Sequence, residues 1–123
     1  MEQIKILIID DEPLIRRAFV RSLRNYSLQV EEANNAKEGL HKIENAVNGN
    51  HPYKVVVIDG LHGLWKEVYE GLTKKSPQSV PILYSATIEY IEEAKEQGIE
   101  TLSKPCEMND LYSLIEKYTK KDQ

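Results

Sequence analysis

The stretch IKILIID at residues 4–10 decides the fold predicted for this chain. It is a β-branched run that ends in acids, and it is too short to form a helix of its own. Two similar runs follow, VVVID at 55–59 and VPILYS at 80–85, and weaker runs occupy 28–33 and 101–104. Continuous hydrophobicity without alternation is typical of strands covered on both faces, as in a parallel sheet. We therefore expect five strands, with the two weaker runs at the sheet edges.

Helical periodicity fills the intervals between these strands. Pro13 suits the first turn of a helix, and Asn35 is placed to cap another. The expected helices open at Pro13, cover 36–46, 65–75 and 88–97, and end with one that begins near residue 109 or 110. The buried stripe of the first helix is expected to comprise Leu14, Ala18, Phe19 and Leu23.

Strict alternation of strand and helix predicts an α/β protein with right-handed crossovers, a doubly wound three-layer sandwich. Periodicity does not decide the strand order. A flavodoxin-like (βα)5 arrangement with the order 2-1-3-4-5 would place the two most apolar runs at the centre of the sheet. The length of 123 residues fits a single domain over 1–123. Ligands of such sheets bind beyond the carboxyl ends of the strands, at the switch point between strands 1 and 3.

The charge, the cysteine content and the length of the apolar runs exclude several classes of function. The formal net charge is −4 with a pI near 5.4, and the basic residues are interleaved with acids, which argues against a nucleic-acid surface. The single cysteine, Cys106, excludes an internal disulfide and a cysteine metal cluster. No apolar run is long enough for a signal peptide or a membrane span. We expect a cytoplasmic protein.

Acids gather at the ends of the first and third expected strands. Asp10, Asp11 and Glu12 close the first, and Asp59 closes the third. Carboxylates this close repel one another and raise each other's pKa unless a cation lies among them. Oxygen ligands with open positions suit Mg²⁺, and no His or Cys is expected to join the cluster, so Zn²⁺ is disfavoured. An acidic turn after the first strand also disfavours a bound phosphate cofactor, which needs backbone amides there.

Two further strands end in groups that bind phosphoryl oxygens. Ser85 ends the fourth strand, and Lys104, followed by Pro105, ends the fifth. The hydroxyl offers a hydrogen bond and the ammonium offers positive charge. Each residue alone also has an ordinary structural explanation, as a cap, a turn residue or a solvated lysine. Together with the acids they indicate phosphoryl transfer onto a carboxylate.

With these residues in place, the sequence resembles the receiver domain of two-component response regulators, including the single-domain chemotaxis type. The resemblance runs from Ile6 to about Tyr118. It is carried by ILIIDDEPLIRR at 6–17, VVVIDG at 55–60, ILYSA at 82–86 and SKP at 103–105.

The resemblance implies roles for the residues that match the family's motifs. Asp59 would be the phosphoacceptor. Asp11 and Asp59 would bind Mg²⁺ directly, with Mn²⁺ as an alternative ion, and Asp10 would act largely through water. The backbone carbonyl of Leu61 would complete the protein's share of the ligands.

The remaining implications concern switching and partners. Lys104 would bridge to the phosphoryl group, and Ser85 with the backbone of Ala86 would move to follow its oxygens. The donor would be a phosphohistidine on a sensor histidine kinase or phosphotransfer protein. The output would be control of a downstream protein or a fused output domain, with homodimerisation on phosphorylation left open. A domain of this kind is not an enzyme, because it catalyses only its own phosphorylation and dephosphorylation.

The sequence departs from the family pattern in several places. Thr101 stands where an aromatic switch residue is usual, and Gly63 stands where a proline is usual. Leu61 and Thr87 occupy the positions that control water access to the acyl phosphate, and the apolar Leu61 predicts slow self-dephosphorylation. His62 is interpreted as a solvated loop histidine.

Two other functions stay open at this point. A pseudo-receiver that only binds proteins would agree with Gly63 and Thr101, but the complete set of acids, serine and lysine argues against it. A Mg²⁺-dependent phosphohydrolase would need a DxD motif after the first strand and additional helices, which the sequence lacks.

Overall fold

The computed structural model describes residues 4–120, which form a five-stranded parallel sheet in the order β2-β1-β3-β4-β5. The strands are β1 (Lys5–Ile9), β2 (Gln29–Ala33), β3 (Val55–Asp59), β4 (Val80–Ser85) and β5 (Glu100–Ser103). The helices are α1 (Pro13–Arg24), α2 (Ala36–Asn48), α3 (Trp65–Lys75), α4 (Ile88–Glu96) and α5 (Met108–Thr119), and a short turn η1 (Leu61–Gly63) precedes α3. The predicted flavodoxin-like (βα)5 fold is confirmed.

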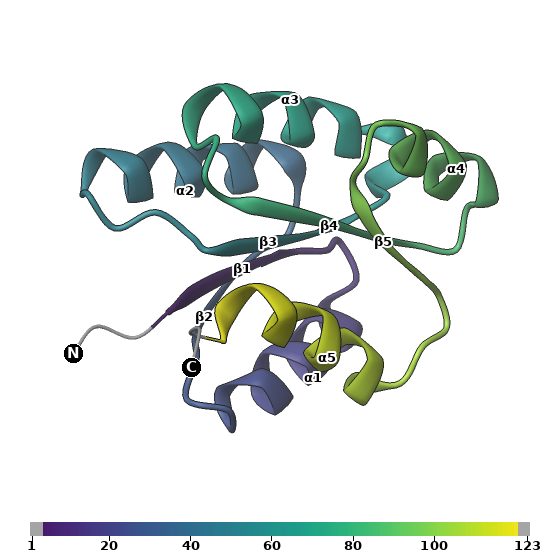
Figure 1. The fold of residues 1–123 in the computed structure, drawn as a ribbon, viewed down its shortest axis with the longest axis horizontal. Helices are drawn as coiled ribbons and strands as arrows, with labels where there is room; N and C mark the ends of the chain where they lie inside the picture. Colours follow the sequence, from purple (N-terminus) through teal and green to yellow (C-terminus); the bar gives the residue numbers. More distant parts are fainter. Residues whose placement is uncertain (1–3, 121–123) are drawn as a thin grey trace.

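Helices cover both faces of the sheet in three layers. Helices α1 and α5 lie on one face, and α2, α3 and α4 lie on the other (Figure 1). Each face buries its own apolar cluster, one around Phe19, Leu23 and Leu111, the other around Ile43 and Trp65. Every residue of β3 is buried, because a central parallel strand is covered on both sides.

Strand positions predicted from the apolar runs agree with the structure to within about one residue. Both weaker runs form edge strands, as predicted. The Asn35 side chain accepts a hydrogen bond of 2.7 Å from the Glu38 amide, which confirms the predicted N-cap of α2. Gly98 follows α4 with φ +78, a left-handed conformation that glycine adopts without steric cost.

The predicted buried stripe of α1 is partly wrong. Phe19 and Leu23 are buried, but Leu14 is 84% exposed and Ala18 is also exposed. The buried face instead runs through Arg16, Phe19, Val20 and Leu23. The helix is therefore rotated so that Arg16, and not Leu14, points inward in its first turns.

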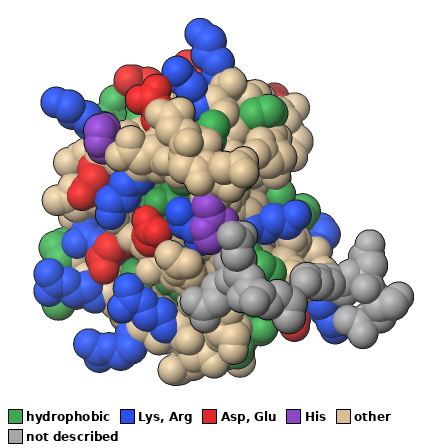
Figure 2. Space-filling view, turned by 90° about the vertical axis from the view of Figure 1, so that its left-hand side faces the viewer, with side chains coloured by type: hydrophobic (Ala, Val, Ile, Leu, Met, Phe, Trp, Pro, Cys, Tyr) green, Lys and Arg blue, Asp and Glu red, His purple; other side chains and the backbone are tan. Residues whose placement is uncertain are grey.

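Within residues 4–120 no helix combines the length and the apolar character that crossing a bilayer requires. On the face of the molecule shown in Figure 2, acidic and basic side chains are interspersed. This agrees with the interleaved charges of the sequence.

Candidate functional site

Strand register brings the two acidic strand ends together. Ile9 of β1 pairs with Ile58 of β3, so Asp10 and Asp59 leave adjacent strands at the same level. The carboxylate of Asp59 is held on both oxygens. Its Oδ1 contacts the Lys104 ammonium, and its Oδ2 accepts a 3.0 Å hydrogen bond from the Leu61 amide. The Lys104 ammonium and the Asp59 carboxylate thus meet at the carboxyl edge of the sheet.

Asp10 is the most deeply buried acid of the site, at 1% exposure. Its Oδ1 accepts a 2.9 Å hydrogen bond from the Glu12 amide. Its buried Oδ2 has no hydrogen-bond partner, although it lies 4.0 Å from the Lys104 ammonium, within ion-pair range. Burial, together with the nearby negative charge of Asp59, raises the pKa of Asp10. A buried carboxylate oxygen without a partner is costly unless a cation or water meets it.

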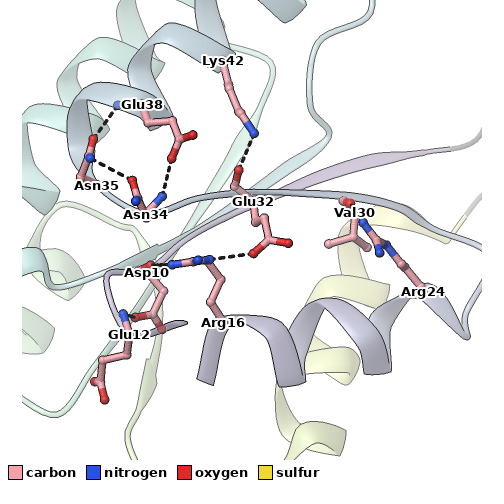
Figure 3. A network of polar contacts seen from close by, with 10 residues as sticks. All are labelled: Asp10, Glu12, Arg16, Arg24, Val30, Glu32, Asn34, Asn35, Glu38 and Lys42. Carbon is pink, nitrogen blue, oxygen red and sulfur yellow. Dashed lines mark hydrogen bonds and ion pairs between the residues drawn. The ribbon is translucent and has the colours of Figure 1, made fainter. Parts of the chain in front are cut away.

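Arg16 fixes the backbone at this acid. Its guanidinium donates a 2.8 Å hydrogen bond to the Asp10 carbonyl and a 2.7 Å bond to the Glu32 carboxylate. Lys42 of α2 in turn donates to the Glu32 carbonyl (Figure 3). Helix α1, the end of β1 and strand β2 are thereby tied together beside the site. Sequence reasoning missed this role, because an arginine on a helix carries no signal of the carbonyl it will meet.

The acids after β1 form a compact group. Carboxylate oxygens of Asp10, Asp11 and Glu12 all lie within 4.8 Å of one another. Asp59 joins this group through Lys104, which lies between the two strand ends. Oxygen donors clustered around an unsatisfied buried carboxylate suit a hard divalent cation. The residues present therefore fit the cation expected from the sequence.

A pocket of about 420 Å³ opens in front of these groups. Its lining comes from the loops after β1, β3, β4 and β5: Asp11, Glu12, Asp59, Gly60, Leu61, His62, Ser85, Ala86, Thr87, Tyr90 and Lys104. Ser85 is buried, and its Oγ accepts a 3.0 Å hydrogen bond from the Thr87 amide. Thr101, which lies on the edge strand β5, is not among the lining residues.

Electrostatics around Lys104 favour its charged form. Burial acts to lower the pKa of this ammonium, but its contact with Asp59 outweighs burial, and the net shift is upward. The ammonium also lies 4.8 Å from the centre of the Tyr84 ring, an arrangement that favours a cation. The Lys104–Pro105 peptide bond is cis.

The turn after Asp59 has an unusual backbone. Leu61, His62 and Gly63 all have positive φ, at 52, 55 and 95. Only the glycine among them adopts such angles freely. The Leu61 side chain is 4% exposed and belongs to the core, and its carbonyl accepts a 3.1 Å hydrogen bond from the Leu64 amide. The Leu61 carbonyl oxygen keeps a second lone pair that could bind a metal ion. The role of this carbonyl as a metal ligand stays a prediction.

Tyr90 forms a wall of the pocket. A methyl group at Gly60 would lie 3.0 Å from Tyr90 Cδ2 and 3.0 Å from Ser85 Oγ. The Tyr90 ring also packs 6.2 Å from the Trp65 ring. A glycine after the phosphoacceptor candidate was the only sequence signal of this close approach.

His62 is exposed, as interpreted from the sequence, yet it is not isolated from the site. Its Nε2 lies 3.6 Å from Asp11 Oδ2. The group of ligand atoms within 4.8 Å of one another comprises Asp10, Asp11 and Glu12, and His62 is not part of it. The left-handed conformation of His62, which the sequence does not reveal, places the imidazole beside Asp11.

Residues 6–116 match the family described as response regulator receiver domain. Because the match spans most of the chain, the protein belongs to this family. Domains of the family are signalling modules of two-component systems, and they interact with histidine kinases or phosphotransfer proteins. No curated protein matches this chain in sequence.

Several solved structures are similar over nearly the whole chain. An adenylate cyclase structure from Rhodopirellula baltica has a TM-score of 0.82 and 25% identity, covering 97% of this chain and 89% of that one. A CheY-like response regulator receiver domain from Methanospirillum hungatei JF-1 has a TM-score of 0.79 and 26% identity, covering 94% and 93%. The response regulator protein TrrA from Thermotoga maritima, in complex with Mg²⁺ and BeF, has a TM-score of 0.76 and 26% identity, covering 94% and 99%.

Proposed function

We propose that Asp59 accepts a phosphoryl group from a phosphohistidine of a sensor histidine kinase or phosphotransfer protein. The observation that carries this proposal is the contact of Lys104 with Asp59, beside the buried and unpartnered Oδ2 of Asp10. A nucleophilic carboxylate, a fixed ammonium and a cation-binding acid cluster are the parts that phosphoryl transfer to a carboxylate requires.

In the proposed step an Asp59 carboxylate oxygen attacks phosphorus and forms the O–P bond. The P–N bond to the donor histidine breaks, and its electron pair stays on the imidazole nitrogen. Lys104 moves from the carboxylate to a phosphoryl oxygen and stabilises its negative charge. The Leu61 amide, which donates to Asp59 Oδ2 at 3.0 Å, keeps the carboxylate oriented during the attack.

The acidic cluster would hold Mg²⁺, with Mn²⁺ as the alternative ion. Asp11, Asp59 and the Leu61 carbonyl would be its ligands, and Asp10 would act mainly through water. The ion would supply charge that neutralises the phosphoryl oxygens. The similarity to TrrA, whose structure contains Mg²⁺ and BeF, supports this choice.

Phosphorylation would act on the loop between β4 and α4. Ser85 Oγ now accepts from the Thr87 amide, and it would rotate to donate to a phosphoryl oxygen, drawing Ala86 and Thr87 with it. The movement would shift an equilibrium between two arrangements of α4, β5 and α5. Because Thr101 replaces an aromatic residue on β5, the shift there is expected to be small.

We further propose that residues 1–123 form one receiver domain that works in the cytoplasm and catalyses only its own phosphorylation and dephosphorylation. Its output would be control of a downstream protein or of a fused output domain. Homodimerisation on phosphorylation is one way in which that control would be exerted. The formal net charge of −4 argues against direct contact with nucleic acid.

The proposal is tested by incubating the protein with acetyl phosphate and Mg²⁺ and recording its intact mass. We expect a gain of one phosphate that disappears in Asp59→Asn and when Mg²⁺ is chelated. Asp110→Asn is the matched control, since Asp110 is an exposed acid in the first turn of α5. This control should gain phosphate like the wild type.

Other outcomes would identify the competing functions. If wild-type protein gains no phosphate under any of these conditions, the chain is a pseudo-receiver that only binds partners. Catalytic turnover of a phosphoester such as p-nitrophenyl phosphate would instead identify a phosphohydrolase. Either result would overturn the assignment of Asp59 as a phosphoacceptor.

A further inference from the structure

The turn that follows Asp59 has a backbone conformation that its residues disfavour. Leu61 and His62 have φ values of 52 and 55, in the left-handed region that favours glycine. Residues in this region cost free energy and persist only where the surrounding structure enforces them. The same turn presents the Leu61 amide to Asp59 Oδ2 at 3.0 Å. The groups that hold the turn therefore also decide how the Asp59 carboxylate is oriented.

One anchor of the turn lies on its inner side, where the Leu61 side chain is buried in the core. The outer side has no comparable anchor of its own, because the His62 side chain is 91% exposed and Gly63 has none. A 2.9 Å hydrogen bond from the Gly63 amide to the Gly60 carbonyl closes the turn, but both groups belong to the turn itself. Support on the outer side must therefore come from another element.

The Tyr90 ring reaches the outer side of the turn from helix α4. A methyl group at Gly60 would lie 3.0 Å from Cδ2 and 3.2 Å from Cε2 of this ring. A methyl group at Gly63 would lie 3.4 Å from the Tyr90 hydroxyl oxygen. One edge of the ring thus runs along the turn from residue 60 to residue 63. Because both positions are glycines, the ring lies directly against the backbone.

Tyr90 is itself held by the core, so its ring is a fixed support. The residue is half-buried and packs against the apolar cluster that contains Trp65, Ile91 and Ala94. Its ring centre lies 6.2 Å from that of Trp65, with the two planes inclined at 54°, an arrangement that aromatic pairs favour. Ile91 and Ala94 bury the inner face of α4 in the same cluster.

We propose that Tyr90 is a positioning residue for phosphorylation of Asp59. Its ring holds residues 60–63 in the left-handed conformation that aims the Leu61 amide at the Asp59 carboxylate. Tyr90 acts through the turn and does not contact the reacting atoms, and the support comes from the ring and not from the hydroxyl. The effect on phosphorylation rests on the proposed function, whereas the effect on the turn does not.

The test compares Tyr90→Ala, Tyr90→Leu and Tyr90→Phe with the matched control Tyr69→Ala. Tyr69 of α3 is also half-buried and packs against the same apolar cluster, but it does not line the site pocket. Both alanine variants lose an aromatic side chain of similar burial, so urea unfolding should show similar losses of stability. Tyr90→Leu is a milder second variant, because it keeps an apolar side chain for folding but lacks the ring edge along the turn.

Hydrogen exchange of the Leu61 amide measures the state of the turn without any phosphorylation. This N–H group donates to Asp59 Oδ2, and a bonded amide exchanges only when the structure opens locally. Tyr90→Ala and Tyr90→Leu should speed its exchange by about tenfold, the scale of one lost hydrogen bond. Tyr90→Phe and Tyr69→Ala should exchange like the wild type.

The rate of phosphate gain from acetyl phosphate and Mg²⁺, followed by intact mass, is the second readout. Tyr90→Ala and Tyr90→Leu should slow this gain by about tenfold, because misplacing a reacting group slows a reaction steeply. Tyr90→Phe should restore the wild-type rate. A role of Tyr90 in stability alone would instead slow Tyr90→Ala and Tyr69→Ala alike, and that result would overturn the proposal.

The two readouts separate this proposal from the proposed function. If the wild type gains no phosphate, the proposed function fails, and fast Leu61 exchange in Tyr90→Ala and Tyr90→Leu would still support the role of the ring in holding the turn. Normal phosphorylation of both variants would overturn the positioning role of Tyr90 and leave the proposed function intact. Wild-type exchange of the Leu61 amide in both variants would also overturn the proposal.

Discussion

Leu61 occupies the position two residues beyond the proposed phosphoacceptor, and its side chain is turned into the core. It is 4% exposed and shares a buried cluster with Trp65 and Ile91. A water molecule that attacks an acyl phosphate needs a polar group to orient it. Leu61 supplies none, so an Asp59 phosphoryl group should be lost slowly.

We expect Leu61→Asn to speed dephosphorylation by roughly tenfold, because an amide at this place can orient water. Asparagine also tolerates the left-handed backbone found here, with φ 52. Leu61→Met keeps an apolar side chain and should leave the rate unchanged. Decay of the phosphorylated mass after removal of acetyl phosphate measures each rate. A wild-type lifetime of seconds that lengthens in Leu61→Asn would contradict the explanation.

At the scale of elements, two helical glycines differ in what surrounds them. A methyl group at Gly39 of α2 would lie 2.5 Å from Ile9 Cδ1, and Ile9 is fully buried in the centre of the core. A methyl group at Gly71 of α3 would lie 2.4 Å from Leu40 Cδ2, the end of a half-buried, flexible side chain. Close packing of α2 on β1 therefore depends on Gly39, whereas Gly71 faces a neighbour that can move.

Gly39→Ala should lower the free energy of unfolding by about 1–2 kcal/mol, since overpacking outweighs the gain in helix propensity. Gly71→Ala should be neutral or stabilise the protein by up to about 1 kcal/mol, because Leu40 can rotate away while the propensity gain remains. Urea unfolding of both variants and the wild type measures the difference. The opposite order of the two effects would show that α2 is not tightly packed against β1.

The elements were predictable because their signals are local. Apolar runs place the strands, and Asn35 and Gly98 mark a helix start and a helix end. Rotation of a helix about its axis is not local, as Leu14 shows. Its place in the apolar pattern suggested burial, but the first turn of α1 turns Arg16 inward to meet the Asp10 carbonyl. The partner of Arg16 is a backbone carbonyl, and the order of residue types along the chain does not reveal where that carbonyl will lie.

At the scale of the whole molecule, the sheet separates two apolar layers. Trp65, the single tryptophan, lies at 1% exposure in the layer beneath α2, α3 and α4. The other layer, beneath α1 and α5, contains no tryptophan within residues 4–120. The fluorescence of Trp65 therefore reports on one layer only, whereas far-ultraviolet circular dichroism reports on all helices.

We expect urea unfolding curves from Trp65 fluorescence and from circular dichroism to coincide, because both layers share the central strands β1, β3 and β4. Coincident midpoints and slopes would show that the domain unfolds as one unit. An earlier fluorescence transition would show that the α2–α4 layer opens independently.

The site was predictable to the extent that it follows strand ends. Asp10, Asp59, Ser85 and Lys104 meet because parallel strands deliver their carboxyl ends to one edge. Residues placed by the rotation of a helix or by loop conformation were not predictable. Tyr90 reaches the pocket from α4, and His62 reaches Asp11 through a left-handed backbone that only Gly63 hinted at.

The contact between the Tyr90 ring and Gly60 links two positions that are far apart in the chain. The ring and the Ser85 hydroxyl both lie against the place that a side chain at position 60 would fill. A larger residue at 60 would require both the Tyr90 ring and the Ser85 hydroxyl to move aside. A side chain at position 60 would therefore press on the serine that the proposed switch uses as well as on the ring that forms the pocket wall.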